Sequence, residues 1–253
     1  MKTEPKIPAV VLITGALTGI GRATAVEFAK EGAHIVVAGR HDEERGKLAA
    51  ELRKFGEEAE YIRADVRHED DVRSLVDRTV RRFGRLDVAV NNAGTEGKPG
   101  PVIEQTAESY ASTFDTNVLG TLLSLKHELR VMLPRGQGSI VNVSSVFGRA
   151  GGPGASVYVA SKHAVEGLTK AAVLEVAGSG VRVNVVAPGP IETGMLNRFT
   201  GNDDKKAALV SRVPLKRAGL PEEIAQAIVF LASDKASFIT GASIAVDGGK
   251  LAG

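Results

Sequence analysis

Seven short runs rich in β-branched residues recur along this chain of 253 residues, with longer amphipathic stretches between them. The runs are Val10 to Thr14, Ile35 to Ala38, Ala59 to Arg63, Leu86 to Val90, Ser139 to Val143, Val181 to Val186 and Ser243 to Val246. Strands that alternate with helices predict repeated β-α-β units, which build parallel sheets. Those around Val10, Val88 and Val183 are almost wholly apolar, as strands covered by helices on both faces must be. We therefore expect an α/β protein whose seven-stranded parallel sheet is doubly wound.

The stretches between the runs predict the helices that cover the sheet. They span Ile20 to Glu31, Asp42 to Phe55, Glu69 to Phe83, Glu108 to Leu133, Val157 to Ala177 and Pro221 to Ala232. No linker or change of composition divides the chain, so residues 1–253 are interpreted as one domain. Two irregular stretches remain, 94–105 and 189–219, the second with a short polar helix expected over 203–211. Long loops at the carboxyl edge of such a sheet commonly carry function, and we expect 189–219 to be a substrate loop or lid.

Composition excludes several classes of function. The 32 basic and 30 acidic residues are spread along the chain, so nothing indicates binding to nucleic acid or to an anionic membrane. There is no cysteine, which rules out disulfides and thiolate chemistry, and the five histidines lack the spacing of a metal site. No apolar run approaches the ~20 residues of a membrane span, and residues 1–8 are polar and unlike a signal peptide. We expect a cytoplasmic protein with small-molecule partners and no metal.

A glycine-rich loop follows the first predicted strand and opens the first predicted helix. It reads Thr14-Gly15-Ala-Leu-Thr-Gly19-Ile-Gly21. Glycines permit a tight turn and a close approach of the backbone to phosphate, and the free amides of the helix that follows face the anion. The pattern G-x-x-x-G-x-G differs from the common dinucleotide fingerprint, and a turn needed only for packing is the alternative. Its place between a strand and an amphipathic helix favours binding of a dinucleotide.

The end of the second predicted strand bears on the choice of dinucleotide. An acid there would hold the ribose 2′-hydroxyl of NAD and repel the 2′-phosphate of NADP. This chain has Gly39-Arg40-His41 instead, and a guanidinium suits a phosphate. The sequence therefore favours NADP(H) over NAD(H). The alternative is that Arg40 is a solvated loop charge and the protein uses NAD(H).

Tyr158 and Lys162 are four residues apart in a predicted helix and therefore share one of its faces. The ammonium, and the helix dipole if Tyr158 lies in the first turn, both favour the phenolate and so lower the tyrosine pKa from ~10. Such a phenol suits a general acid or base near neutral pH. A pair with this spacing also occurs by chance on solvated helix faces, so its neighbours in the fold decide its role.

In combination these features resemble the short-chain dehydrogenase/reductase family across essentially the whole chain. Its motifs occur in order: Thr14 to Gly21, Asp65, Asn91-Asn-Ala-Gly94, Asn117, Ser144-Ser145, Tyr158-x-x-x-Lys162, Pro188-Gly189 with Thr193, and Asp247-Gly-Gly249. The resemblance implies a Rossmann-type fold and four catalytic residues. Ser145 would hydrogen-bond the substrate oxygen, and Tyr158 would exchange the proton with it. Lys162 would hold the nicotinamide ribose and lower the tyrosine pKa, while Asn117 would bind a water that links Lys162 to solvent.

The same resemblance implies which residues contact the cofactor. They are Gly15, Thr18, Gly19, Ile20, Gly21, Arg40, Asp65, Val66, Asn91, Ala93, Gly94, Tyr158, Lys162, Pro188, Gly189, Ile191 and Thr193. In this family an asparagine at the position of Asn91 more often ties the central strand to its neighbours, so both roles stay open. Leu17 and Thr18 stand where NADP-preferring members often have a basic residue, which weakens the inference from Arg40.

Three functions stay open on the sequence. The leading one is an NAD(P)(H)-dependent alcohol dehydrogenase or carbonyl reductase that acts on a small secondary alcohol or ketone. A reductase of 3-ketoacyl groups on acyl carrier protein is a variant within this class, although no dense basic patch for an acidic carrier is evident. A non-catalytic NAD(P)-sensing protein on the same fold is the alternative from another class. The resemblance also implies a homotetramer, with which the helices predicted at 108–133 and 157–177 are consistent.

Overall fold

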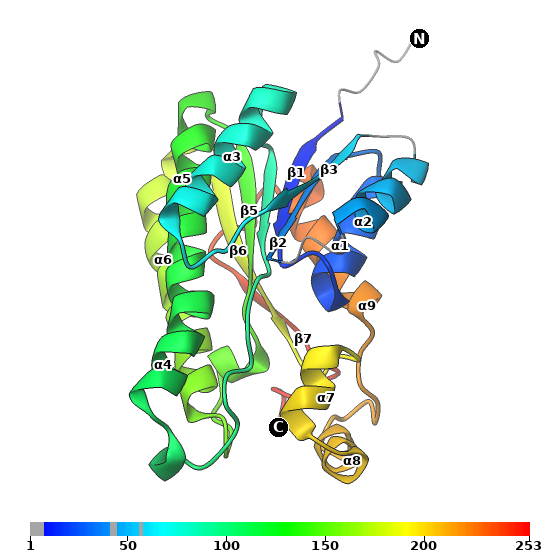
Figure 1. The fold of residues 1–253 in the computed structure, drawn as a ribbon, viewed down its shortest axis with the longest axis vertical. Coiled ribbons are helices and arrows are strands. Elements are labelled where there is room, and N and C mark those ends of the chain that lie inside the picture. The colour runs from blue at the N-terminus through cyan, green and yellow to red at the C-terminus, as the bar shows by residue number, and fades with distance from the viewer. Residues whose placement is uncertain (1–7, 41–44, 56–57) are drawn as a thin grey trace.

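The sheet is parallel throughout, and its seven strands run in the order β3-β2-β1-β4-β5-β6-β7. The computed structural model describes residues 8–40, 45–55 and 58–253. The strands are β1 (Val10–Thr14), β2 (His34–Gly39), β3 (Ala59–Arg63), β4 (Val88–Asn91), β5 (Gly138–Val143), β6 (Val181–Pro188) and β7 (Ser243–Val246). The predicted α/β fold with a doubly wound, seven-stranded sheet is confirmed (Figure 1).

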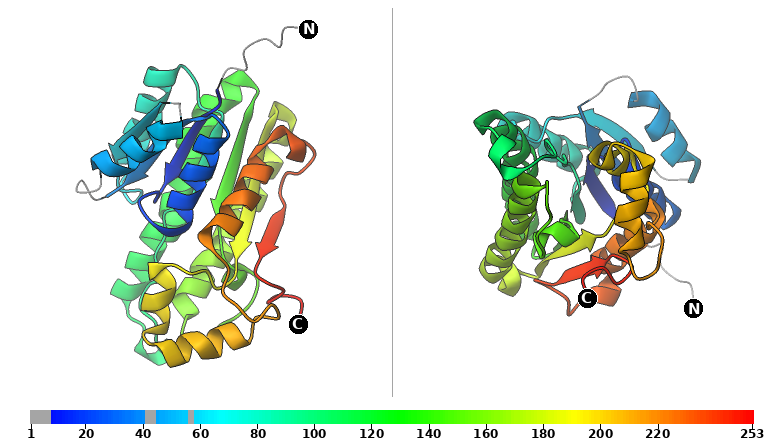
Figure 2. Two further views of the ribbon diagram at one scale, coloured as in Figure 1. Left: turned by 90° about the vertical axis from the view of Figure 1, so that its right-hand side faces the viewer. Right: turned by 90° about the horizontal axis from the view of Figure 1, so that it is seen from below.

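Helices cover both faces of the sheet, as Figures 1 and 2 show. The helices on one face are α1 (Gly19–Lys30), α2 (Arg45–Leu52) and α9 (Pro221–Ala232). Those on the other face are α3 (Glu69–Phe83), α5 (Gly120–Met132) and α6 (Ser156–Val176). Beyond the carboxyl ends of the strands stand α4 (Ala107–Phe114), α7 (Gly194–Thr200) and α8 (Asp203–Ser211). In the described part of the chain, no helix is both long and apolar enough to cross a membrane.

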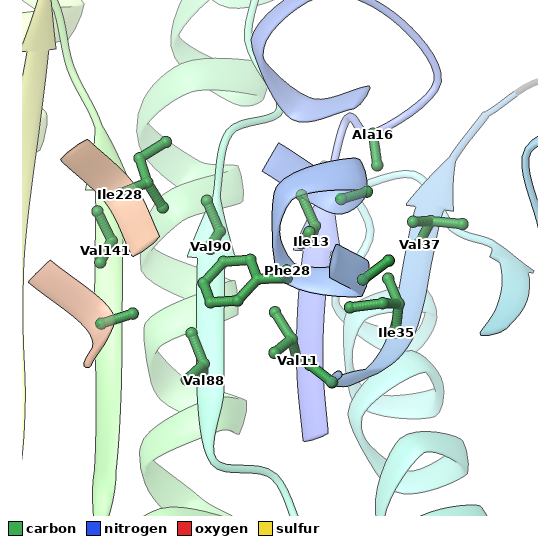
Figure 3. Packing of buried hydrophobic residues seen from close by; sticks show 14 of the residues in the cluster. Val11, Ile13, Ala16, Phe28, Ile35, Val37, Val88, Val90, Val141 and Ile228 are labelled. Atoms are coloured by element: carbon green, nitrogen blue, oxygen red, sulfur yellow. The ribbon is translucent and has the colours of Figure 1, made fainter. Parts of the chain in front are cut away.

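Successive side chains of each strand enter two separate cores. Val11 and Ile13 of β1 pack with α1 and α9, whereas Leu12 between them packs with α3 and α5. Figure 3 shows the first core, in which Phe28 of α1 lies among valines and isoleucines of the central strands. Because side chains alternate along a strand, both faces are apolar only where both are covered. Burying each aliphatic side chain contributes about 2 kcal/mol, which explains the unbroken apolar runs of the sequence.

The helix predicted over 108–133 is confirmed, with one irregularity that the sequence pattern does not show. The chain forms α4 and α5 there, joined by a π-helical turn at Asp115–Leu119. The apolar periodicity continues through this turn, so the sequence pattern hides it. π-Turns are frequent at functional sites, and this one contains Asn117.

The segment 189–219 contains more helix than the sequence suggests. The polar helix predicted over 203–211 is present as α8, and α7 precedes it. Thr193 caps α7, because its hydroxyl accepts a hydrogen bond from the amide of Leu196 at 3.3 Å. The lid function of this segment stays a prediction. Residues 42–44, where the helix predicted over 42–55 begins, lie outside the described residues.

The strand order reverses between β1 and β4, and side chains tie the two strand ends together. The Thr14 hydroxyl accepts hydrogen bonds from the amides of Asn92 and Ala93, each at 3.2 Å. The Asn92 side-chain amide donates to the carbonyl oxygens of Thr14 at 3.1 Å and Gly15 at 2.9 Å. In open parallel sheets, ligands bind at such a reversal, beyond the carboxyl ends of the strands.

A buried polar network crosses the sheet directly beneath this edge. The side-chain amide of Asn91 donates to Glu128 of α5 at 3.0 Å and to Asn142 of β5 at 2.9 Å. Asn142 in turn donates to the hydroxyl of Thr169 of α6 at 2.8 Å. The Asn91 side-chain oxygen has no hydrogen-bond partner among the described residues. The network therefore fastens β4 and β5 to two helices and leaves one acceptor open.

Burial raises the pKa of Glu128 to about 7, against the lowering effect of the hydrogen bond from Asn91. Because this folded pKa lies above the ordinary value of 4.5, the folded protein keeps a proton that the unfolded chain has already released. The resulting stability is complete below the unfolded pKa and is lost as the pH rises through the folded pKa. Between about pH 5 and about pH 8, we expect the wild-type free energy of unfolding to fall by roughly 3 kcal/mol relative to Glu128→Gln.

Urea unfolding of both proteins across this range measures the difference. In the Glu128→Gln variant, a neutral amide donor replaces the carboxyl group and can serve the open acceptor of Asn91. Glu175→Gln is the matched control, because Glu175 is an exposed glutamate on α6. Parallel pH profiles for the wild type and the Glu128→Gln variant would contradict the prediction.

Candidate active site

The loop after β1 is shaped for an anion. Gly15 and Gly19 have φ of +65° and +55°, a left-handed backbone that glycine adopts without strain. At Gly21 an added Cβ atom would lie 2.4 Å from the carbonyl oxygen of Gly15. Thr18 precedes α1 without capping its first amides, and the first turn has no acidic residue. These amides can therefore face a phosphate, and the loop fits the pyrophosphate of a dinucleotide.

The carboxyl ends of β2 and β3 carry two neighbouring arginines. Arg40 and Arg63 are both exposed, and Nε of Arg63 donates to the carbonyl oxygen of Arg40 over 3.3 Å. Beyond them, Arg67 holds the carboxylate of Asp65, with 2.6 Å between Nη2 and Oδ2. Hydrogen bonds from Arg67 keep the pKa of Asp65 below its usual value despite burial, and the charge of Arg40 adds to this. Arg40, Arg63 and Arg67 thus lie at the ends of these two strands, while His41 lies outside the described residues.

Tyr158, Lys162 and Ser145 line a single pocket at the reversal of strand order. Tyr158 and Lys162 lie in the first two turns of α6, and Ser145 follows β5 at the start of a 3-10 turn. The ring of Phe147 packs edge-on against that of Tyr158, with 6.2 Å between the ring centroids. The pocket is open, and its empty space of about 830 Å³ includes solvent at the mouth.

The two serines after β5 have different surroundings. The Ser144 hydroxyl donates to the carbonyl oxygen of Lys162 over 3.3 Å and so ties β5 to α6. The Ser145 hydroxyl accepts from the amide of Phe147 at 3.2 Å, which leaves its own proton for an acceptor in the pocket. Ser145 is therefore the serine placed to donate to a substrate oxygen.

The π-helical turn places Asn117 near Lys162. Its side-chain amide donates to the carbonyl oxygen of Thr95 at 2.9 Å and to the hydroxyl of Ser161 at 3.0 Å. A Cβ atom added to Gly94 would lie 3.3 Å from the Asn117 side-chain oxygen and 3.6 Å from Nζ of Lys162. Glycine at position 94 thus allows both groups to approach the same stretch of backbone. All four predicted catalytic residues are therefore brought into one neighbourhood.

Burial dominates the ionisation of the tyrosine and the lysine. It raises the pKa of Tyr158 to about 12, although the hydrogen bond with Ser145 lowers it, and the charge of Glu96 raises it further. It lowers the pKa of Lys162 to about 8, against the charge of Glu166. Nζ of Lys162 lies 5.7 Å from the centre of the Tyr158 ring and donates to the carbonyl oxygen of Val143 at 2.9 Å. Burial therefore raises the pKa of Tyr158 in this structure, whereas the sequence predicts a lowered pKa.

The predicted cofactor residues lie in three places. Those that line the pocket with Tyr158 and Lys162 are Ile20, Gly94, Pro188, Gly189, Ile191 and Thr193. Those on the loop after β1 and at the ends of β2 and β3 are Gly15, Thr18, Gly19, Gly21, Arg40 and Asp65. Ala93 lies beside this loop, because its amide donates a hydrogen bond to the Thr14 hydroxyl. Val66 is buried and packs against Gly120 of α5. Asn91 contacts the buried network beneath the pocket, which is the structural role that the sequence left open.

Charged side chains of the pocket were missed by the sequence patterns. Glu96 lies in the irregular stretch after β4, only 9% exposed, and its carboxylate accepts from Arg198 of α7 at 2.5 Å and 3.1 Å. Lys250 lines the same pocket from beyond β7. The only sign of Glu96 in the sequence was an acidic residue within a glycine-rich stretch. Its contact with Arg198 spans 102 residues and follows no local pattern.

No group of three or more side chains suited to hold a metal ion occurs among residues 8–40, 45–55 and 58–253. The apolar lining of the pocket includes Val146, Phe147, Leu196, Phe199 and Leu209. An apolar pocket with a few convergent polar groups is typical of a small-molecule site.

Comparison with known proteins agrees with this geometry. Residues 15–250 match the family model described as "Enoyl-(Acyl carrier protein) reductase". The chain is 43% identical over 240 residues to a cis-4-hydroxycyclohexanecarboxylate dehydrogenase of Sinomonas cyclohexanicum, with 95% of each chain covered. It is 40% identical over 249 residues to a 3-oxoacyl-(acyl-carrier-protein) reductase of Thermotoga maritima, with 98% of this chain and 99% of the relative covered.

Two solved structures share the fold over nearly their whole length. Levodione reductase superposes with a TM-score of 0.93 at 36% identity, with 96% of this chain and 98% of that chain covered. The structure of ElxO with NADP bound gives a TM-score of 0.90 at 35% identity, with 98% and 100% covered. The chain therefore belongs to the short-chain dehydrogenase/reductase family, as an NAD(P)-dependent oxidoreductase that acts on CH–OH groups.

Proposed function

We propose that the protein interconverts a small secondary alcohol and the corresponding ketone, with Tyr158 as the general acid and base. The observation that carries this proposal is the single pocket shared by Ser145, Tyr158, Lys162 and Gly189. Hydride transfer is the chemistry that a bound nicotinamide supplies there. The substrate enters an apolar pocket and presents its oxygen to the two hydroxyls.

Each side chain has one task in ketone reduction. Ser145 donates a hydrogen bond to the carbonyl oxygen and orients it. Tyr158 has a pKa raised to about 12, so it holds its proton at neutral pH and can give it to the oxygen as negative charge develops there. The charge of Lys162, one helical turn away, offsets the phenolate that this transfer leaves behind. Asn117 positions the backbone around Lys162 through Thr95 and Ser161.

Removal of one hydroxyl tests the role of Tyr158. We expect Tyr158→Phe to lower kcat by about 10²- to 10⁴-fold, the usual contribution of general acid–base catalysis. Cofactor affinity, measured by fluorescence titration, should change by no more than about threefold, because the variant keeps the ring that packs on Phe147. Tyr110→Phe is the matched control, since Tyr110 is 52% exposed on α4. Turnover of the Tyr158→Phe variant at the wild-type rate would rule out this role.

We also propose that NADP(H) is preferred over NAD(H). Support comes from Arg40 and Arg63 at the ends of β2 and β3, where a 2′-phosphate would meet two guanidinium groups. The NADP-bound relative is consistent with this preference. The absence of a basic residue at Leu17 and Thr18 weighs against it.

Kinetics with both cofactors test the preference. We expect kcat/KM for NADP⁺ to exceed that for NAD⁺, and Arg40→Ala to reduce this ratio by about 10- to 100-fold, as loss of a charge-assisted hydrogen bond predicts. Arg73→Ala, which removes an exposed arginine paired with Asp70 on α3, should leave the ratio unchanged. A wild-type ratio well below one would overturn the preference.

The substrate proposal is a secondary alcohol or ketone on a small saturated ring. The pocket is lined by apolar side chains, and relatives are named for cyclohexane-ring alcohols, including a cyclohexanol dehydrogenase of Acinetobacter. We expect cyclohexanol and cyclohexanone to be turned over faster than 3-ketoacyl thioesters, measured by the absorbance of the reduced nicotinamide. Faster turnover of the thioesters would favour the acyl-carrier-protein reductase instead. Binding of cofactor without turnover of any carbonyl compound would favour a sensor.

We further propose that residues 1–253 act in the cytoplasm as one catalytic domain, assembled as a homotetramer. Exposed apolar side chains on α5, on α6 and in the segment 237–246 support assembly. Among them are Leu122 at 46%, Leu174 at 86% and Phe238 at 103% exposure. Such surface is suited to burial between copies of the chain. Light scattering at micromolar concentration that finds a monomer would exclude this assembly.

A further inference from the structure

The pocket has three charged side chains in an otherwise uncharged lining. These are Glu96, Lys162 and Lys250. Lys162 donates to the carbonyl oxygen of Val143 at 2.9 Å, and Glu96 is bound through both carboxylate oxygens by Arg198. The ammonium of Lys250 has no hydrogen bond or ion pair with any of the residues that the structure describes. Among the described residues, the ammonium of Lys250 is therefore the charged group of this pocket without a polar partner.

The backbone around Lys250 is held firmly. Asp247 accepts hydrogen bonds from the amides of Gly249 at 2.8 Å and Leu251 at 2.9 Å, on either side of the lysine. Gly248 and Gly249 have φ of +65° and +87°, which other residues adopt only with strain. A Cβ atom added to Gly189 would lie 2.8 Å from the Cα of Asp247, so this turn packs on the loop that lines the pocket. The turn thus fixes where the lysine side chain begins.

Lys250 lines the pocket together with apolar side chains. It is half-buried and shares the pocket with Met195 and Phe199 of α7 and with Leu209 of α8. Figure 1 shows the C-terminal end of the chain beside these two helices. A cation near apolar side chains loses hydration, and an anion beside it restores that loss. Glu96 does not serve this purpose, because Arg198 already occupies its carboxylate.

We propose that Lys250 binds a carboxylate of the substrate, so that the substrate class is a hydroxy acid or the corresponding keto acid. This proposal rests on the function proposed above and adds a second point of attachment. The reacting oxygen lies at Ser145 and Tyr158, and the acidic group lies at Lys250. Two attachments within an apolar pocket fix the orientation of the ring as well as its position, which favours a single reacting geometry.

Paired substrates isolate the effect of the charge. Cyclohexanone with a 4-carboxylate and the same ring with a 4-carboxamide differ little in shape but by one negative charge. For the wild type we expect kcat/KM to be about 10- to 100-fold higher for the acid, as a charge-assisted hydrogen bond predicts. Lys250→Met should reduce this ratio to near one, and Lys250→Arg should retain most of it. Lys235→Met, at an exposed lysine of the turn Asp234–Ala236, is the control for loss of one positive charge.

A binding measurement separates this proposal from the proposed reaction. Cyclohexanecarboxylate has no oxygen to reduce, so calorimetric titration into the protein saturated with NADP⁺ reports on the carboxylate alone. Weaker binding to Lys250→Met supports the proposal even if no ketone is turned over. Equal binding to the wild type and the variant, or an unchanged ratio of acid to amide, overturns it. Loss of NADP⁺ affinity in Lys250→Met with an unchanged ratio also overturns it, because the lysine would then serve a cofactor phosphate.

Discussion

The meeting of β1 and β4 is the constraint on which the rest of the site depends. The strand order grows from β1 toward β3 on one side of this pair and from β4 toward β7 on the other. In open parallel sheets, ligands bind beyond the carboxyl ends of the strands at such a reversal. Hydrogen bonds from Asn92 to Thr14 and Gly15 hold the two strand ends together. They also set the path of the glycine loop, since Asn92 contacts its first residue directly. Asn92 therefore holds the glycine-rich loop after β1 and also lines the pocket of Tyr158 and Lys162.

Burial shifts the pKa values of the tyrosine and the lysine that line the pocket. Lys162 is buried and Tyr158 is partly buried, and burial favours the neutral form of each. The protein answers with fixed polar partners, among them the carbonyl oxygen of Val143 for the lysine and the hydroxyl of Ser145 for the tyrosine. Preorganised partners of this kind stabilise charge without reorganisation when the proton moves. Beneath the pocket, the buried carboxyl group of Glu128 likewise has a fixed polar partner, the side-chain amide of Asn91.

Much of the fold could be predicted because its signals are local. Helix α3 and strand β1 have the predicted bounds, since amphipathic and apolar periods follow directly from which faces are covered. The π-helical turn at Asp115–Leu119 could not be predicted this way, because it inserts a residue without interrupting the apolar pattern. Helix α7 is short, and its only start signal is Thr193, a residue already explained by another motif. Local patterns therefore predicted the long regular elements but not the π-helical turn or the short helix α7.

By itself the sequence determined the sheet and the order of the motifs, because apolar periods and spacing along the chain are local properties, and the family resemblance of those motifs pointed to Ser145, Tyr158 and Lys162. Only the tertiary structure decided how those groups ionise. Burial depends on every element packed around Tyr158, and it reversed the direction that the lysine and the helix dipole alone would set. Only the tertiary structure, too, placed Glu96 and Lys250 in the lining of the pocket and Arg198 on the carboxylate of Glu96. These residues are distant along the chain and come together only in the folded protein. No rule of sequence spacing connects them.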